Sequence, residues 1–422
     1  MKSVFIVSLF TLLFSIVSIE AVPLGEAVSR ALTNNPEAAA AEYATAAAID
    51  DIYAAEAAFL PTASLTGSAG PQLRDRSTDG ITSTGDWLFT REAAVTVRQL
   101  IFDGGVTKNQ ILSVKDRAEA AKYGEKQIRE TIAIATVEAY LNILRSEQLI
   151  DAALRNVAAH REAERKAQQR ADVGGERSDL ALVQGRSGLA KSVLEDRRAS
   201  LKQAEIQYQR FVGAAPSHLS MPPRPGGVPK SLEAIDTSGN WTVLAAAEIA
   251  KARDHEWQSL RAQYFPRVDF EGRGSVGEDL QGIRGEDNAA AFLARISWDA
   301  IDFSRRPAIR AAAARVDQSV ALISQAELEA FQTAGESWAQ LLGARSQLGS
   351  LSEYKRELGG VLGDYEEQFK VGKRSFLNLL DLRNEQFRAE SALIDAIYQE
   401  RIAEYRILAV SGRLAAMFSS EK

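Results

Sequence analysis

The chain has 422 residues, a formal net charge of -6 and 45% hydrophobic residues, enough to bury a sizeable core. The acidic balance and the even spread of basic residues give no nucleic-acid footprint, so no nucleic-acid partner is expected. The chain contains no cysteine, which excludes disulfides, thiolate metal sites and a lipidated N-terminal cysteine.

The first residues predict a signal peptide at 1–21. Lys2 precedes an apolar run from Val4 to Ile19, and Ala21 is a suitable residue before a cleavage point. The alternative is a retained membrane anchor, although the run is short for a spanning helix, which needs about 20 apolar residues. We expect cleavage near Ala21 and export. Because no second run of spanning length follows, an exported chain that enters a membrane must do so as a β-barrel.

Two segments without proline predict long helices. No proline lies between Pro71 and Pro216, and none follows Pro307. Proline costs a helix interior about 3 kcal/mol, so these segments can stay helical throughout. From Val106 to Ala171 apolar residues recur at helical spacing without a strong stop signal, which predicts a helix of roughly 100 Å. Glycines in the matching segment of the second half predict a kinked or looser helix there: Gly335, Gly343, Gly359, Gly360 and Gly363.

The chain is internally duplicated. AAFLPTASLTG, starting at Ala57, matches AQYFPRVDFEG, starting at Ala262, and QLIFDGG at Gln99 resembles WDAIDFS at Trp298. Each half reads helix, strand, loop, strand, long helix, turn, helix. We therefore divide the chain into a signal peptide at 1–21, a first repeat at 22–215, a Pro- and Gly-rich linker at 216–235 and a second repeat at 236–422.

The expected strands have one apolar and one polar face. In VDFEGRGSV, Val268, Phe270 and Val276 alternate with Asp269 and Glu271. This pattern is typical of outer-membrane strands, with apolar side chains toward lipid, although an ordinary half-buried hairpin packed on a helix is the alternative. Each half supplies one hairpin, and bacterial barrels begin at eight strands. A barrel must therefore be shared between protomers, and three copies would give twelve strands.

Several motifs, each weak alone, together carry a family resemblance. They are LGEAVSRALTNNPE at Leu24, the FLP strand entry, QLIFDGG, QYQRFVGAAP at Gln207 and VGKRSFLNLLDLRNEQF at Val371, with a looser copy, VGGERSDLALVQGRSGL, at Val173. They cover nearly the whole mature chain, in family order. The sequence thus resembles the TolC family of trimeric outer-membrane channel-tunnels.

The resemblance implies a mainly α fold with a transmembrane β-barrel. Three protomers would form a trimeric 12-stranded barrel, four strands per protomer, continuing into a long α-helical coiled-coil barrel in the periplasm. We expect a homotrimer in outer-membrane lipid, extending into the periplasm. Its partners would be a periplasmic adaptor protein and an inner-membrane ABC or other transporter, and no cofactor or metal is expected.

The family places two aspartates on successive turns of the final helix, where they ring the pore constriction. These positions fall on Asn378 and Asp381, so the resemblance implies one ring of three carboxylates instead of two. Crowded like charges predict cation binding and raised pKa values. The asparagine argues against strong block by divalent cations.

The two VG turns resemble the helix tips at the periplasmic entrance. The family's closed-state lock uses an aromatic residue and an arginine, which fall on Phe369 and Arg374. We expect an ion pair for Arg374; its family partner would fall near Ala181, and Asp179 is close by. The alternative for all these residues is a solvated helix tip. Two turn glycines and a helix-capping serine complete the expected gate: Gly174, Gly372 and Ser375.

Three aromatic residues are expected at the membrane interface. Trp87 and Phe89 lie just before the second strand, and Trp298 lies at the periplasmic end of the fourth. Aromatic girdles occupy such positions in barrels, and core packing is the rival interpretation.

The sequence favours an exit duct over two other classes of protein. Type I protein secretion is preferred to small-molecule (drug or metal) efflux, because the lipidated cysteine of many efflux members is absent and the first turn resembles secretion members. A periplasmic coiled-coil scaffold without a pore is the alternative, but it leaves the repeated hairpins unexplained. No enzyme is expected, because His160, His218 and His255 fall in unrelated segments and no catalytic motif occurs.

Overall fold

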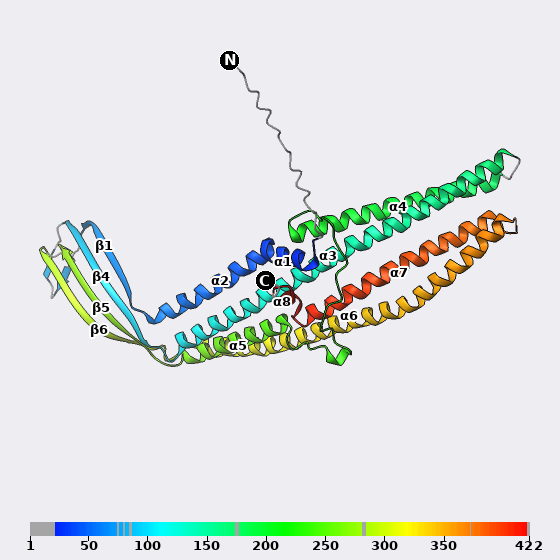
Figure 1. Cartoon of the computed structure of the whole chain (residues 1–422). Helices are drawn as coiled ribbons and strands as arrows, with labels where there is room; N and C mark the ends of the chain where they lie inside the picture. Colours follow the sequence, from blue (N-terminus) through cyan, green and yellow to red (C-terminus); the bar gives the residue numbers. More distant parts are fainter. Residues whose placement is uncertain are drawn as a thin grey trace, which may run out of the picture.

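The computed structural model describes residues 22–73, 76–78, 81–83, 87–173, 177–280, 284–371 and 373–419. The expected signal peptide and the turn glycines Gly174 and Gly372 lie outside these residues. The molecule is long and narrow, with a curved sheet at one end and the turns of two helical hairpins at the other (Figure 1). The short C-terminal helix lies near the middle.

The elements follow the order expected for two repeats. The first half contains α1 (Leu24–Asn34), α2 (Pro36–Glu56), η1 (Ala57–Phe59), β1 (Thr62–Gln72), β2 (Arg76–Thr78), β3 (Ile81–Ser83), β4 (Leu88–Phe102), α3 (Val106–Asp172) and α4 (Arg177–Val212). The linker carries η2 (Leu232–Ala234). The second half contains α5 (Trp241–Ala262), β5 (Arg267–Glu278), β6 (Glu286–Ser297), α6 (Arg305–Lys370), α7 (Phe376–Val410) and α8 (Leu414–Ser419).

Four antiparallel strands form the sheet, in the order β1-β4-β5-β6. Each half contributes one hairpin, and β4 joins β5 across the repeats, with Arg98 opposite Glu271. The expected number of sheet strands per protomer is therefore confirmed. The short pair β2-β3 was not predicted. The strands β1 and β6 are the two edges of the sheet, and their outer backbone groups have no partner strand among the described residues.

The motif DGG turns the chain from β4 into the longest helix. Gly104 and Gly105 have φ of 70° and 95°, a left-handed region that favours glycine. A Cβ on Gly104 would also lie 2.5 Å from the Cβ of Phe265. Asp103 Oδ2 then accepts a hydrogen bond of 2.8 Å from the Thr107 N–H, which satisfies one free donor at the start of α3.

The two longest helices run almost the full distance from the sheet to the turns. α3 has 67 residues, so its length at 1.5 Å per residue is about 100 Å, as predicted. α6 has 66 residues and stays helical through six glycines, curving gradually without a sharp bend (Figure 1). The predicted kink is therefore wrong, whereas the alternative, a looser helix, stays a prediction. In the part of the chain described, no helix combines the length and apolar character needed to cross a membrane.

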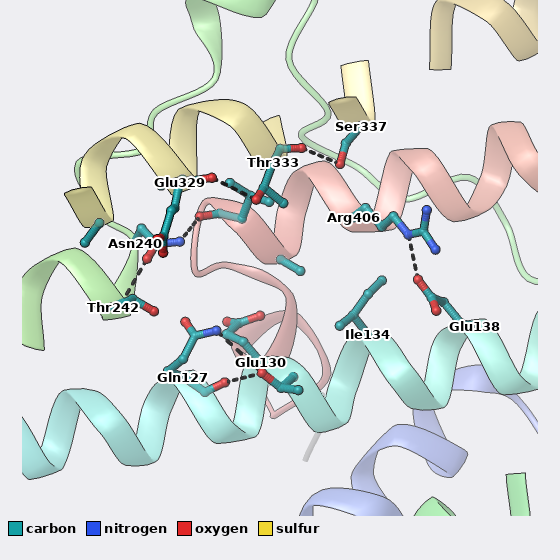
Figure 2. Close-up of a pocket in the computed structure, with 15 residues that line it drawn as sticks. Gln127, Glu130, Ile134, Glu138, Asn240, Thr242, Glu329, Thr333, Ser337 and Arg406 are labelled. Atoms are coloured by element: carbon teal, nitrogen blue, oxygen red, sulfur yellow. Dashed lines mark hydrogen bonds and ion pairs between the residues drawn. The ribbon is translucent and has the colours of Figure 1, made fainter. Parts of the chain in front are cut away.

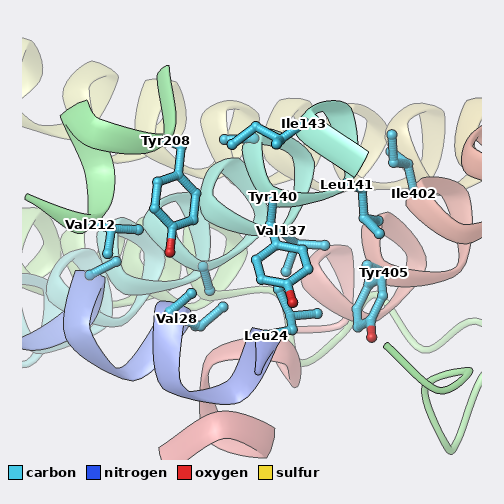
Figure 3. Packing of buried hydrophobic residues seen from close by; sticks show 14 of the residues in the cluster. Leu24, Val28, Val137, Tyr140, Leu141, Ile143, Tyr208, Val212, Ile402 and Tyr405 are labelled. Carbon is cyan, nitrogen blue, oxygen red and sulfur yellow. The ribbon is translucent and has the colours of Figure 1, made fainter. Parts of the chain in front are cut away.

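The main hydrophobic core lies at mid-length, where α1, α3, α4, α7 and α8 meet (Figure 3). Tyr140 of α3 is fully buried there. The carbonyl oxygens of Val22 and Ser220, at 2.9 and 2.8 Å, share its single hydroxyl proton, and its oxygen accepts from the Ser220 N–H at 3.0 Å. Tyr140 thus fastens two segments to the longest helix: the linker, and Val22, which lies two residues before α1.

A second set of buried polar contacts fastens the linker to α6 and α7. Glu400 and Glu404 of α7 are almost fully buried and share two arginines, Arg224 of the linker and Arg345 of α6. Burial alone would raise the pKa of Glu400, but hydrogen bonds and charge from Arg345 and Arg224 outweigh it and lower that pKa. Breaking such a buried cluster leaves uncompensated charge, so it fixes how these elements pack.

Candidate functional site

The sheet has its apolar side chains outside and its charged side chains inside. Phe292 of β6 is 78% exposed, whereas Glu271 of β5 is 8% exposed. The exposed apolar side chains extend over all four strands: Leu65, Val95, Val97, Phe270, Val276, Phe292 and Ile296. A continuous apolar face of this kind would be costly in water but is favourable against lipid. The alternating pattern therefore does not come from a hairpin whose apolar face packs on a helix.

Ion pairs join the strands across the inner face. Glu271 Oε2 contacts Arg98 of β4 at 3.1 Å and Arg295 of β6 at 3.4 Å. Further along the same face, Arg273 contacts Glu92 at 3.0 Å. Arg98 and Glu271 are directly opposite each other, and the other two pairs are offset diagonally along the strands, so opposite charges on adjacent strands compensate one another. The inner face is consequently polar but locally charge-balanced, as suits the wall of a water-filled passage.

The three interface candidates lie at opposite ends of the sheet and are exposed within the protomer. Trp87, 69% exposed, precedes β4 at the end far from the helices, and Phe89 lies inside β4, not before it as the sequence suggested. Trp298, 61% exposed, follows β6 at the helical end, where its Nε1 donates to the Tyr264 carbonyl at 3.1 Å. Packing of these residues in a protomer core is therefore wrong.

The spacing between these two rims agrees with a membrane. β5 has 12 residues, so at about 3.4 Å per residue it extends for about 40 Å. A strand tilt of about 40° reduces the height to about 30 Å, close to the apolar band of about 25 Å plus its flanking aromatic girdles.

At the opposite end, the two hairpins α3–α4 and α6–α7 lie side by side (Figure 1). Their apolar contact is a small cluster in which Ala163, Ala167 and Val183 pack against Leu380 of α7. Asp381 is the next residue, and its carboxylate Oδ1 accepts from Nη1 of Arg186 of α4. The one acidic residue expected at the constriction is therefore paired with an arginine from the other repeat.

The expected lock residues make contacts, but different ones from those predicted. Phe369 of α6 packs on Phe376 with ring centroids 5.8 Å apart, and the cations of Lys166 and Arg170 of α3 lie 5.9 and 5.3 Å from its ring. It therefore connects the two hairpin tips through cation–π contacts.

Arg374 does not form the expected ion pair with any described residue. Its Nε donates to Gln368 Oε1 at 2.9 Å, and its guanidinium lies 4.3 Å from the ring of Tyr365. Both partners belong to the preceding helix, so Arg374 closes its own turn and does not reach Asp179. Asp179 is exposed in the first turn of α4, where a negative charge complements the helix dipole.

The prediction for the helix cap is confirmed. Ser375 has extended backbone angles, and its hydroxyl accepts a hydrogen bond of 3.2 Å from the N–H of Asn378. The side chain of Asn378 also contacts the Ser375 hydroxyl. Asn378 therefore completes the capping arrangement in this protomer.

Arg186 is the residue that sequence reasoning missed. A signal was present, since the two turns read RSDLALVQGR and RSFLNLLDLR, with a second arginine at the same position, Arg186 and Arg383. Arg383 pairs with Glu366 inside its own hairpin at 2.9 Å, whereas Arg186 reaches across to the other hairpin. Arg186 and Arg383 therefore occupy equivalent positions in the two repeats but form ion pairs with different kinds of partner.

A groove of about 360 Å³, lined by both polar and apolar side chains, lies at mid-length between α3, α5, α6 and α7 (Figure 2). Asn240 caps α5 with its side-chain oxygen and donates its Nδ2 to the Val410 carbonyl at 3.0 Å. Arg406 of α7 reaches Glu138 of α3 at 2.6 Å. The polar groups of the groove thus serve to join helices. No group of three His, Cys, Asp or Glu side chains within the described ranges is placed to hold a metal.

Known proteins resemble the chain over most of its length. Residues 27–214 and 238–413 match the family described as outer membrane efflux protein. The outer membrane efflux protein BepC of Brucella suis biovar 1 (strain 1330) is 24% identical over 347 residues, which cover 80% of this chain and 75% of that protein.

Solved structures share the fold at low sequence identity. VceC from Vibrio cholerae gives a TM-score of 0.81 at 14% identity, covering 92% of this chain and 96% of that one. The MtrE outer membrane channel of Neisseria gonorrhoeae gives 0.77 at 18% identity, covering 92% and 88%. The mainly helical fold with four sheet strands and an internal duplication is thereby confirmed. Because the family match spans most of the chain and both repeats, the protein belongs to the outer membrane efflux protein family, whose members are passive channels and not enzymes.

Proposed function

We propose that three copies of this chain form the outer-membrane exit duct of a tripartite export system. The sheet carries the proposal, because its apolar side chains are exposed on one face and its charged side chains form ion pairs on the other, with Glu271 buried. Four strands with two open edges can close only with other copies, and three copies give a twelve-stranded barrel. The helices would continue the passage across the periplasm.

The ends of the molecule suggest where its partners bind. A periplasmic adaptor and an inner-membrane transporter, of the ABC or another class, would meet the hairpin tips, and outer-membrane lipid would surround the sheet. Asp381, on α7 near the tip, is assigned to the constriction, with Asn378 one turn before it. Trp87, Phe89 and Trp298 are assigned to the two membrane interfaces, which their exposure at opposite ends of the sheet supports.

Two classes of cargo are proposed for the duct. Type I secretion of a protein is the prediction from the sequence. Efflux of small molecules is the second candidate, and the name of the relative BepC, an outer membrane efflux protein, favours it. A strain that lacks the chain distinguishes them. Loss of a protein from the medium supports secretion, whereas increased sensitivity to dyes, drugs or metals supports efflux.

The duct itself is tested by fractionation and conductance. We expect the protein to remain with outer membranes after osmotic shock and, after detergent extraction, to insert into planar bilayers with discrete conductance steps. A protein that is released by osmotic shock and never conducts would instead be a periplasmic scaffold.

A further inference from the structure

The ion pair between Arg186 and Asp381 connects the two repeats beside the small apolar cluster at the tips. Arg186 lies on α4 and Asp381 on α7, and each follows a buried apolar residue of the shared cluster, Val183 and Leu380. These two anchors hold the backbones of both partners in place, so the pair is a consequence of packing. Arg186 is about two-thirds buried along its side chain, whereas Asp381 is 61% exposed.

The helix that carries Arg186 contains residues near this point that lower its stability. Gly185 and Gly188 flank the arginine, and each glycine costs a helix about 1 kcal/mol relative to alanine. Ser187 is buried, yet its hydroxyl has no hydrogen-bond partner among the described residues. The same holds for Nδ1 of His160, which lies on α3 at the matching level between two apolar layers. These features lower the cost of bending α4 here once its contact with α7 is lost, while Val183, Ala190 and Leu194 still pack on α3.

We propose that Arg186 belongs to the constriction: in each protomer it neutralises Asp381 and latches α4 to α7 in the closed state. The inference rests on the proposed function, because it requires Asp381 to face the passage. It changes the expected selectivity, since three Asp381 carboxylates paired with three Arg186 guanidinium groups give a ring of no net charge. Opening the tip then breaks the three Arg186–Asp381 pairs and exposes three carboxylates and three guanidinium groups to the passage.

The test uses the full-length protein in planar bilayers under a KCl gradient, with four variants. Arg186→Gln leaves the carboxylate ring uncompensated and should shift the reversal potential toward that of K⁺. Asp381→Asn leaves the guanidinium ring and should shift it toward that of Cl⁻. Both should raise the open probability, by roughly 1.5- to 5-fold per broken pair, the range expected for exposed ion pairs.

A charge-swapped variant and a matched control separate pairing from damage to the fold. Arg186→Asp combined with Asp381→Arg should restore both the selectivity and the low open probability of the wild type. Arg198→Gln removes an arginine of the same helix whose one ion pair among the described residues is with Glu195, one turn away, and it should change neither quantity. Helix content of each variant is checked by circular dichroism.

Other outcomes would contradict the latch, the place of Asp381 at the constriction, or the duct itself. A shift for Asp381→Asn alone, with Arg186→Gln silent, overturns the latch but keeps Asp381 at the constriction. Channels that conduct but respond to no variant overturn both assignments and leave the duct intact. A protein that never inserts overturns the proposed function, and the inference falls with it.

Discussion

The helices are fastened differently at mid-length and at the hairpin tips. At mid-length, buried carboxylates of α7 share arginines from the linker and from α6, and Tyr140 fastens two further segments. At the tips, the hairpins share a small apolar cluster, cation–π contacts and a half-exposed ion pair. The more deeply buried polar contacts thus lie at mid-length. The contacts near the entrance are ones that can be exchanged at low cost.

The largest effect is expected from Arg345→Ala at mid-length. Its Nε and Nη2 donate to the buried carboxylates of Glu400 and Glu404, at 2.9 and 3.0 Å. Losing one partner of a buried pair costs about 3–5 kcal/mol, and partial exposure of the guanidinium and the remaining Arg224 reduce this to about 2–4 kcal/mol. Denaturant unfolding in detergent measures the loss.

A control on the same helix sharpens this prediction. Arg356 contacts Glu353 and Glu357, and all three side chains are exposed. Arg356→Ala should therefore cost no more than about 1 kcal/mol. Equal losses for the two variants would mean that the mid-length cluster is no firmer than the surface, and the contrast between the two regions would disappear.

The next effect concerns the hydroxyl of Tyr140. Tyr140→Phe keeps the ring but leaves two carbonyls and one N–H without their partner, which costs about 1–3 kcal/mol. Tyr398 is the matched control, because its ring is also buried but its hydroxyl has no partner among the described residues. Tyr398→Phe should be neutral or stabilising in the same thermal unfolding measurement. A loss as large as that of Tyr140→Phe would refute the role of these hydrogen bonds.

Glu130 makes the middle of the molecule sensitive to pH. Its Oε2 accepts from the N–H groups of Leu414 and Ala415 at the start of α8, both at 3.1 Å, and burial raises its pKa to about 7. The folded protein therefore binds this proton more tightly than the unfolded chain. The stabilisation is complete below pH about 4.5 and is lost as the pH rises through 7.

Replacing Glu130 by glutamine tests whether stability falls as the pH rises. The amide oxygen can still accept from α8 but never ionises, so Glu130→Gln should raise the free energy of unfolding at pH 8 by about 1–2 kcal/mol, a discounted conversion of the pKa shift. At pH 5 the difference should vanish. Glu119→Gln, an exposed change on the same helix, should leave the pH dependence of unfolding unaltered. A wild-type stability that does not fall between pH 5 and 8 would contradict the assignment.

The sequence predicted what depends on local pattern and failed where distant elements meet. The absence of proline predicted the length of α3, and the alternation of apolar and polar residues predicted the strand β5. Ser375 was identified as a cap from its place after a turn. The partner of Asp381 depends on how α4 packs against α7, 195 positions apart, which no local pattern encodes.

The same limit explains two other failures. Arg374 was expected to reach the other hairpin, but Gln368 and Tyr365 lie within reach on its own helix and require no movement of a second element. Glu130 sits in a stretch as polar as its neighbours, so nothing local marks it as the carboxylate that α8 buries. Repetition identified equivalent positions, but the two repeats place them against different neighbours.

The smallest expected effect concerns His160 near the tip, and its pH dependence is opposite to that of Glu130. His160 is buried, and burial followed by the charge of Arg186 lowers its pKa, so the wild type loses stability as the pH falls below about 6.5. His160→Leu removes both the unpaired nitrogen and this proton site and should stabilise the tip by about 1 kcal/mol. Hydrogen exchange at pH 5.5 should slow in peptides of α4 near Arg186, while peptides around Tyr140 exchange as before. Because a weakly held tip is what allows α4 to leave α7, the same variant should also open less often in bilayers. Slower exchange without rarer opening would show that the softness of this layer is unrelated to gating.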